Sequence, residues 1–251
     1  MNMDRSSFSR YACATICRKK YYWRYVRNLV PKEESKALGI GKLFHLGVAN
    51  LGTEEDKQKP WYEIGQLARS YWNVTGPCEV AKTFDLGQGL SIKYVADGIE
   101  DGYLIEYKTT SDASADNVTA QAMSLQLRLG CLLFSLKGTK LRLVKKPLIR
   151  QKKGESEHEF DQRYFNLFRD EPQNHFLEII VPALSEGALA EFNHIHSEVI
   201  RCERANVWPM AVPMVCKGKV SCEYMPLCSD AQTNMPLFME KPTYEVEDSE
   251  I

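Results

Sequence analysis

The chain has 251 residues, of which 44% are hydrophobic and 26% charged, and its 32 lysines and arginines nearly balance 33 acidic residues. These proportions exclude collagen-like, fibrous and wholly disordered chains, and they fit one globular domain with a sizeable core. The sequence contains no run of about 18 apolar residues, the length that a membrane helix needs. A net charge of −1 gives no whole-molecule signal for nucleic acid, so any such signal must come from local patches.

The first residues predict a cytoplasmic protein. Residues 1–6 pass directly into a charged, aromatic segment and lack the apolar stretch of a signal peptide. We therefore expect no membrane partner.

Helical periodicity dominates the first third of the chain. We expect helices over about residues 7–29 and 37–52 and, after a polar insert at 53–60, a third helix that ends near residue 76. Three short β-rich runs separated by Gly-containing turns follow, at 78–86, 90–97 and 103–109. This pattern predicts a three-strand meander.

Helices and strands alternate in the second half. The pattern predicts a long helix over about 117–136 with Gly138 as its stop, then a strand at 140–149, a helix at 155–169, a strand at 174–181 and a helix at 184–205. The acidic residues 240–251 predict a disordered tail. Together these elements predict an α/β fold with a mixed central sheet flanked by helices.

Three of the eight cysteines form an evenly spaced cluster. Five residues separate Cys216 from Cys222 and Cys222 from Cys228. Thiols spaced in this way among Gly, Ser and Pro are typical of metal or cluster ligands on turns. A disulfide framework is not expected in a cytosolic chain of this size. Spacing alone leaves zinc, an iron–sulfur cluster and plain buried thiols open.

The meander is predicted to bring two carboxylates and a lysine together. Side chains alternate faces along a strand, so Glu106 and Lys108 project to one side while Tyr107 points away. Asp97 is expected at the end of the preceding strand, beside Glu106. Paired carboxylates can hold a hard divalent cation, and an adjacent lysine can orient a bound water and offset charge on a phosphate. A Glu-x-Lys alone is usually a solvated face, but the joint arrangement is rarer.

The order of these motifs resembles the PD-(D/E)XK nuclease superfamily, specifically its RecB-like exonuclease branch, which includes many phage-encoded members. The resemblance runs over about residues 7–228. Cys17 and the basic-aromatic residues 18–25 resemble the family's opening helix. Gly41 and His45 are similar to its Gly-x-x-x-His motif, whose histidine contacts the catalytic metal.

Asp97, Glu106 and Lys108 match the signature carboxylates and lysine of that family. The resemblance implies a restriction-endonuclease-like sheet with a cysteine-bound subdomain formed by the two ends of the chain. The implied roles are metal binding by His45, Asp97, Glu106 and the carbonyl of Tyr107, catalysis by Asp97, Glu106, Lys108 and Gln126, and ligation of a 4Fe-4S cluster by Cys17, Cys216, Cys222 and Cys228.

The sequence also departs from the family pattern. Relatives often carry Gln-x-x-x-Tyr on the helix after the lysine, but neither Gln121 nor Gln126 is followed by that tyrosine. Gln126 is favoured because it lies deeper in the expected helix. The first gap between the C-terminal cysteines is five residues, whereas many relatives have two, and no proline follows Cys17.

Two stretches are candidates for contact with DNA. Arg18, Lys19, Lys20, Tyr22 and Trp23 interleave cations with aromatic rings, which suits phosphate contact with base stacking. A second basic patch lies within residues 145–153. Taken by itself, each stretch is equally typical of a solvated face.

We therefore expect a DNA nuclease that uses Mg²⁺ or Mn²⁺, an exonuclease acting in recombination, repair or phage DNA processing beside a recombinase or helicase partner. The expected layout is one nuclease domain over 1–239, with an iron–sulfur subdomain from about 7–30 and 206–230. If phage-encoded, the protein would work in the host cytoplasm. The alternatives are a catalytically inactive DNA-binding protein and a zinc-bound module for protein interaction.

Overall fold

The computed structural model describes residues 6–87, 90–217 and 221–241. The chain divides into two compact units, the first made of Met1–Phe8 and Ser35–Glu191 and the second of Ser9–Glu34 and Phe192–Ile251. No helix within the described ranges combines the length and the apolar character that a membrane span requires.

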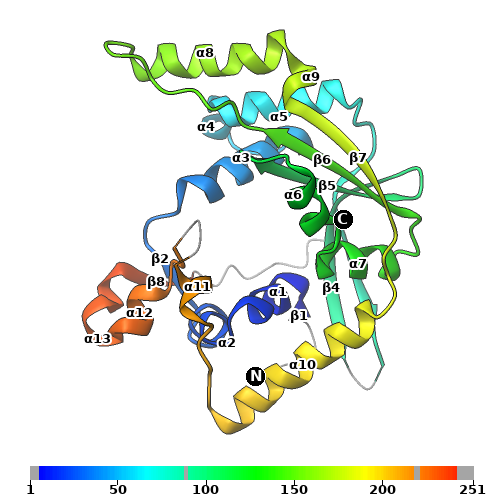
Figure 1. Ribbon diagram of the computed structural model, residues 1–251, viewed down its shortest axis with the longest axis vertical. Coiled ribbons are helices and arrows are strands. Elements are labelled where there is room, and N and C mark those ends of the chain that lie inside the picture. The colour runs from blue at the N-terminus through cyan, green and yellow to red at the C-terminus, as the bar shows by residue number, and fades with distance from the viewer. Residues whose placement is uncertain (1–5, 88–89, 218–220, 242–251) are drawn as a thin grey trace. The chain divides into compact units, whose positions relative to one another are not determined.

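A six-stranded mixed sheet forms the centre of the first unit (Figure 1). Its path runs β1–β4–β5–β6–β7, and β3 pairs with β4. The pairs β1–β4 and β5–β6 are parallel, and the others are antiparallel. The bounds are β1 (Ser6–Ser7), β3 (Cys78–Asp85), β4 (Ser91–Glu100), β5 (Tyr103–Thr110), β6 (Gly138–Lys145) and β7 (Phe176–Pro182). The expected meander is present as β3, β4 and β5.

Helices cover both faces of this sheet, which confirms the predicted mixed α/β fold. One face carries α3 (Lys36–Ala49), α5 (Pro60–Tyr71) and α8 (Glu157–Asp170), whose apolar side chains share a core with Ile105 and Tyr107. Gly47 and Gly65 let α3 and α5 approach closely, because a β-carbon on Gly65 would clash with the carbonyl of Phe44. This close packing fixes α3, the helix that carries His45.

The opposite face is covered by two helices where the sequence predicted one. They are α6 (Ala115–Ala122) and α7 (Leu125–Leu133), and Ser124 between them has an extended ψ of 140°. Gly138 does not stop a helix but begins β6. β6 ends at Lys145, four residues earlier than expected, shortly before Pro147, which has no N–H to donate to a ladder.

Several other bounds differ by a few residues from those expected. α10 (Ala188–Ala205) begins after Gly187, which adopts a φ of +71° that ends the preceding turn. The short helices α4 (Glu54–Lys57) and α9 (Pro172–His175) precede α5 and β7. Thr53 is the N-cap of α4 and Pro172 is the first residue of α9, and both residue types are common at these positions.

The second unit begins with a helix that the sequence predicted as continuous. Cys17 has an extended backbone and separates α1 (Phe8–Ile16) from α2 (Arg18–Tyr21), which passes into the π-helical turn η1 (Tyr22–Val26). The remaining elements are β2 (Leu29–Pro31), α11 (Pro213–Cys216), α12 (Met225–Ser229), α13 (Ala231–Asn234), η2 (Met235–Leu237) and β8 (Phe238–Glu240).

β2 and β8 pair antiparallel and tie the two ends of the second unit together. Trp23, Leu29, Tyr224, Leu227 and Phe238 form its core. Because Glu240 belongs to β8, the predicted tail cannot begin at that residue, and residues 242–251 lie outside the described part of the chain.

Candidate metal-binding active site

Ligand atoms from three elements converge in the first unit. His45 on α3, Glu79 on β3 and Asp97 on β4 each offer one atom, and these atoms lie within 4.8 Å of one another. His45 Nδ1 is 3.4 Å from Asp97 Oδ1 and 3.9 Å from Glu79 Oε1. Among the residues that the structure describes, no other set of three or more His, Cys, Asp or Glu groups meets at this spacing. Imidazole nitrogen and carboxylate oxygen are suitable ligands for a divalent metal.

The backbone of β5 orients Asp97. Residues 98–100 of β4 pair with residues 103–105 of β5, and the ladder ends there. The N–H of Tyr107, two residues further along β5, therefore has no partner in the β4 backbone. Asp97 Oδ2 accepts this hydrogen bond from Tyr107 N at 2.7 Å, which leaves Oδ1 facing His45. The sequence had predicted Asp97 at the end of its strand. The strand continues to Glu100, so Asp97 lies within β4.

Glu106 and Lys108 lie on the same side of β5, as their spacing predicted. Lys108 Nζ pairs with Glu106 Oε1, and Gln126 Nε2 donates to Glu106 Oε2 at 3.4 Å. Tyr94 holds Gln126 in place by donating its hydroxyl to the Gln126 carbonyl at 2.7 Å. The structure therefore places Gln126, at the start of α7, beside Glu106, whereas Gln121 belongs to α6.

Negative charge is in surplus at this cluster. Burial raises the pKa of Glu106 to about 7, and the nearby Asp97 carboxylate adds to this rise. Burial lowers the pKa of His45, but its hydrogen bonds to Asp97 and Glu79 outweigh that effect and raise the pKa to about 10. Both groups therefore hold their protons more tightly because of the neighbouring carboxylates. A bound divalent cation would offset the same repulsion between carboxylates, so the residues present fit such a metal.

Sequence reasoning missed Glu79, which reads as an ordinary strand residue. Its position follows from the register, because Cys78 pairs with Gly98 and Val80 with Ala96, so Glu79 lies level with Asp97. Glu79 also has a φ of 57°, which is rare for a residue with a side chain and costs about 1–3 kcal/mol where it occurs. Only a correct β3–β4 register could have identified it from sequence.

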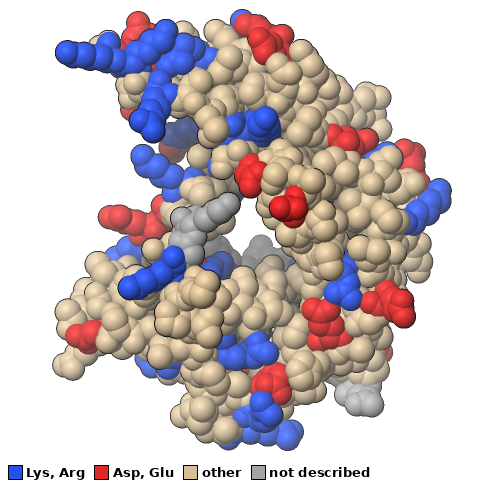
Figure 2. Space-filling model, in the orientation of Figure 1, with Lys and Arg blue, Asp and Glu red and all other residues tan. Residues whose placement is uncertain are grey.

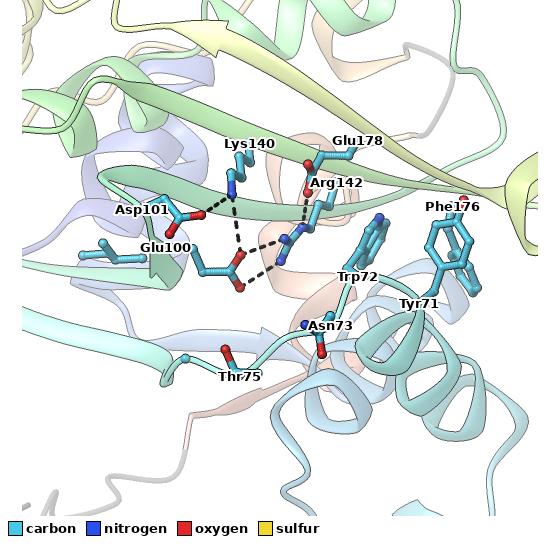
Figure 3. A pocket seen from close by; sticks show the side chains of 12 residues that line it. Tyr71, Trp72, Asn73, Thr75, Glu100, Asp101, Lys140, Arg142, Phe176 and Glu178 are labelled. Atoms are coloured by element: carbon cyan, nitrogen blue, oxygen red, sulfur yellow. Dashed lines mark hydrogen bonds and ion pairs between the residues drawn. The ribbon is translucent and has the colours of Figure 1, made fainter.

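The other face of β5 carries a second charged group (Figure 3). Arg142 on β6, 2% exposed, donates through Nε to Glu178 at 2.7 Å and through Nη1 and Nη2 to Glu100 at 3.1 and 2.7 Å. Its Nη1 also donates to the Tyr107 hydroxyl at 3.2 Å. Lys140 pairs with Asp101 at 3.1 Å. A pocket of about 630 Å³ lies over this network, lined by the aromatic rings of Tyr71, Trp72 and Phe176.

Tyr107 connects the two faces. Its N–H bonds Asp97, and its ring packs in the core, edge to face with the His45 ring at 6.0 Å. Only the Tyr107 carbonyl had been predicted to take part in the site. Its N–H and its ring thus contact two of the candidate ligand residues, Asp97 and His45.

The four predicted cluster cysteines belong to the second unit. Cys17 Sγ accepts from Lys20 N at 3.4 Å and from Ala211 N at 3.3 Å. Cys222 N donates to the Cys216 carbonyl at 2.9 Å. Burial raises the pKa of Cys228, and the neighbouring thiols of Cys17 and Cys222 raise it further. The bond from Lys20 N makes Cys17 the N-cap of α2, so this side chain also has a local role in the fold.

The basic-aromatic stretch is largely engaged in folding. Trp23 is 6% exposed within the core of the second unit, so the expectation that its ring stacks on DNA is wrong. Lys20 and Arg24 pair with Glu223 at 3.1 and 3.6 Å. Lys19 lies over the Tyr22 ring at 4.6 Å. Arg18 donates to the Ala14 carbonyl.

No protein-family model matches the chain, and no curated protein matches it by sequence. Among solved structures, SSO0001 is 14% identical with a TM-score of 0.43, over 80% of this chain and 77% of that chain. A phage-related exonuclease from Haemophilus somnus 129PT is 12% identical with a TM-score of 0.40, over 78% of this chain and 93% of that one. With both TM-scores below 0.5, these likenesses alone assign neither fold nor function.

Proposed function

We propose that the protein is a divalent-metal-dependent nuclease that hydrolyses phosphodiester bonds in DNA. The observation that carries the proposal is the convergence of His45, Glu79 and Asp97, with the buried Glu106–Lys108 pair on the adjoining strand. Oxygen and nitrogen ligands with a surplus of carboxylates are what Mg²⁺ or Mn²⁺ requires.

In this proposal His45, Glu79 and Asp97 hold the cation, and Glu106 adds its carboxylate from β5. When bound, such a cation lowers the pKa of a water molecule and offsets charge on the phosphate. Lys108 has its pKa raised by the Glu106 carboxylate in spite of burial, so it remains an ammonium. That ammonium orients the water for attack and stabilises negative charge on the phosphate oxygens.

The remaining residues position this machinery. Gln126 and Lys108 hold the two oxygens of Glu106, so its carboxylate plane is fixed. Tyr107 N–H fixes Asp97 in the same way. These contacts reduce the reorganisation that the site would need when substrate arrives.

We further propose exonuclease action and a 4Fe-4S cluster held by Cys17, Cys216, Cys222 and Cys228. In the second unit the cluster would fasten the segment at Cys17 to residues 216–228. Visible absorbance of anaerobically purified protein, lost in Cys222→Ser, tests the cluster, because Zn²⁺ is d¹⁰ and colourless.

Digestion of end-labelled linear and circular DNA with Mg²⁺ or Mn²⁺ tests the activity. We expect loss of linear DNA from its ends, abolished by Asp97→Ala and by Lys108→Ala, with the circular dichroism spectrum unchanged. Asp101→Asn is the matched control, because Asp101 is on an exposed turn and asparagine tolerates its φ of 53°. Undiminished cleavage by Lys108→Ala would refute the assignment of the site.

A further inference from the structure

The segment between β6 and α8 is strongly basic. Residues 145–155, here called the basic arm, contain Lys145, Lys146, Arg150, Lys152 and Lys153 and no acidic residue before Glu155. In the first unit, this arm is an extended loop leading to α8 (Figure 1), where lysine and arginine side chains gather on the surface (Figure 2).

The arm is held in a defined shape. Arg163 on α8 binds both oxygens of Glu155, at 2.7 and 2.9 Å, and donates to the Arg150 carbonyl at 3.0 Å. Lys152 N donates to the Glu155 carboxylate at 2.7 Å, and Gln151 Nε2 donates to the Glu155 carbonyl at 2.7 Å. These hydrogen bonds of Glu155 and Arg163 fix the backbone of the arm. Because the backbone that carries the cations is already ordered, less conformational entropy is lost when a ligand binds.

The cations of the arm are available to a ligand. Within the described residues, none of the five has a carboxylate oxygen within 4.0 Å, whereas Lys57 and Lys59 of the same unit pair with Glu54 and Glu55 at 2.7 and 3.3 Å. Arg150, Lys152 and Lys153 are exposed. Leu148, which lies between Lys146 and Arg150, is 84% exposed. Cations interspersed with an apolar side chain suit a partner that combines phosphates with apolar base faces.

The arm starts at the end of β6, the parallel neighbour of the strand β5 that carries the proposed catalytic lysine. Lys108 pairs with Leu143 and Thr110 with Lys145 in the parallel β5–β6 ladder, and Lys146 N donates to the Thr110 carbonyl at 2.7 Å. Two residues of strand span about 7 Å, comparable to the step between neighbouring phosphates along one strand. A nucleic acid with one phosphate at Lys108 would thus have its next phosphates within reach of the arm.

We propose that the basic arm binds the phosphate backbone of DNA beyond the scissile bond. This inference rests on the proposed nuclease function for the identity of its partner, but the binding it describes is measurable without cleavage. The arm would contribute affinity that depends on salt and not on base sequence.

The test compares Lys152→Gln/Lys153→Gln with the control Lys57→Gln/Lys59→Gln, which changes the net charge equally at lysines that already have acidic partners. Binding of a fluorescent duplex is followed by anisotropy in EDTA, where hydrolysis does not occur, over a series of salt concentrations. We expect the slope of log K against log salt to shrink by about 2 in the arm variant, about 1 for each lost phosphate contact, and not in the control.

An unchanged slope in the arm variant, or an equal change in both variants, would overturn the proposal. Thermal melting of each variant confirms that it is folded. If the wild-type protein never cleaves DNA but the slope still shrinks, the nuclease assignment fails and the arm proposal stands. If cleavage occurs and the slope is unaffected, only the arm proposal fails.

Discussion

The two faces of β5 place buried charge in different settings. On one face, Arg142 and Lys140 lie among Glu100, Asp101 and Glu178, and the Arg142 guanidinium donates to carboxylates on both sides. On the other face, Lys108 pairs with Glu106, and beside this pair the Asp97 and Glu79 carboxylates of β4 and β3 lie close to His45, which reaches them from α3.

Under the proposed function, the difference separates charge that stabilises the fold from charge that would bind the proposed cation. A buried charge is tolerated when opposite charges and hydrogen bonds compensate for its lost hydration. Arg142 meets that condition through Glu100 and Glu178, without any added group. The cluster at Asp97 does not, since Glu106 and His45 both shift toward their protonated forms. The pocket of about 630 Å³ lies over the face that carries Arg142, here called the balanced face, and its lining does not include His45, Glu79 or Asp97.

Breaking the balanced face should have the largest effect on stability. Arg142→Met leaves Glu100 and Glu178 without their buried partner, and we expect a loss of about 3–5 kcal/mol in the free energy of unfolding, measured in urea. Arg169→Met is the control, because Arg169 is exposed and pairs with its neighbour Asp170, so little change is expected. A small loss for Arg142→Met would show that the network is not structural.

Glu79→Gln sharpens the comparison on the other face. It removes one ligand and one surplus charge, so we expect DNA cleavage to fall by about 10²–10³-fold while the metal-free protein remains as stable as wild type. Rates at saturating DNA over a Mn²⁺ titration measure the effect. Full activity at low Mn²⁺ would exclude Glu79 from the metal site.

Part of this site could be predicted from sequence and part could not. The period of two along a strand is enough to put Glu106 and Lys108 on one side and Tyr107 on the other. The part played by Glu79 could not be predicted. Its position beside Asp97 depends on the β3–β4 register and on a left-handed backbone conformation, and no local sequence pattern indicates either. The mixed sheet followed from alternating patterns, which survive errors of a few residues in each element.

Burial of single side chains was harder to predict than the fold. Trp23 reads as a partner for DNA because its neighbours are cationic, yet it packs against Tyr224, Leu227 and Phe238, which lie about 200 residues away. The break between α6 and α7 was missed because Met123 and Ser124 fit a helical pattern. That break begins α7 next to Gln126, so the error concerned the part of the helix that matters for the site.

Metal and pH should act together on stability. Folded Glu106 keeps its proton to about pH 7, whereas the ordinary value is 4.5, so the folded state binds more protons in that window and stability falls as pH rises through it. His45, shifted from 6.5 to about 10, has the same sign and extends the fall at higher pH. We expect Mn²⁺ to raise the melting temperature more at pH 8.5 than at pH 5.5, because fewer protons then compete for the ligands.

The melting temperatures, measured in EDTA and in Mn²⁺ at both pH values, provide the check. Asp97→Asn should lose the Mn²⁺ effect at both. An equal Mn²⁺ effect at pH 5.5 and 8.5 would contradict the assignment of these ligands.

The smallest expected effect separates the two faces most directly. Glu178→Gln is the same chemical change as Glu79→Gln, but it falls on the balanced face and leaves Arg142 bound to Glu100 through two N–H donors. We expect a loss of about 1–2 kcal/mol in the free energy of unfolding, because one charge-assisted hydrogen bond is weakened, and no change in cleavage per folded molecule. If Glu178→Gln lowered the cleavage rate as much as Glu79→Gln, charge on either face would serve the same site, and the distinction between balanced and unbalanced carboxylates would fail.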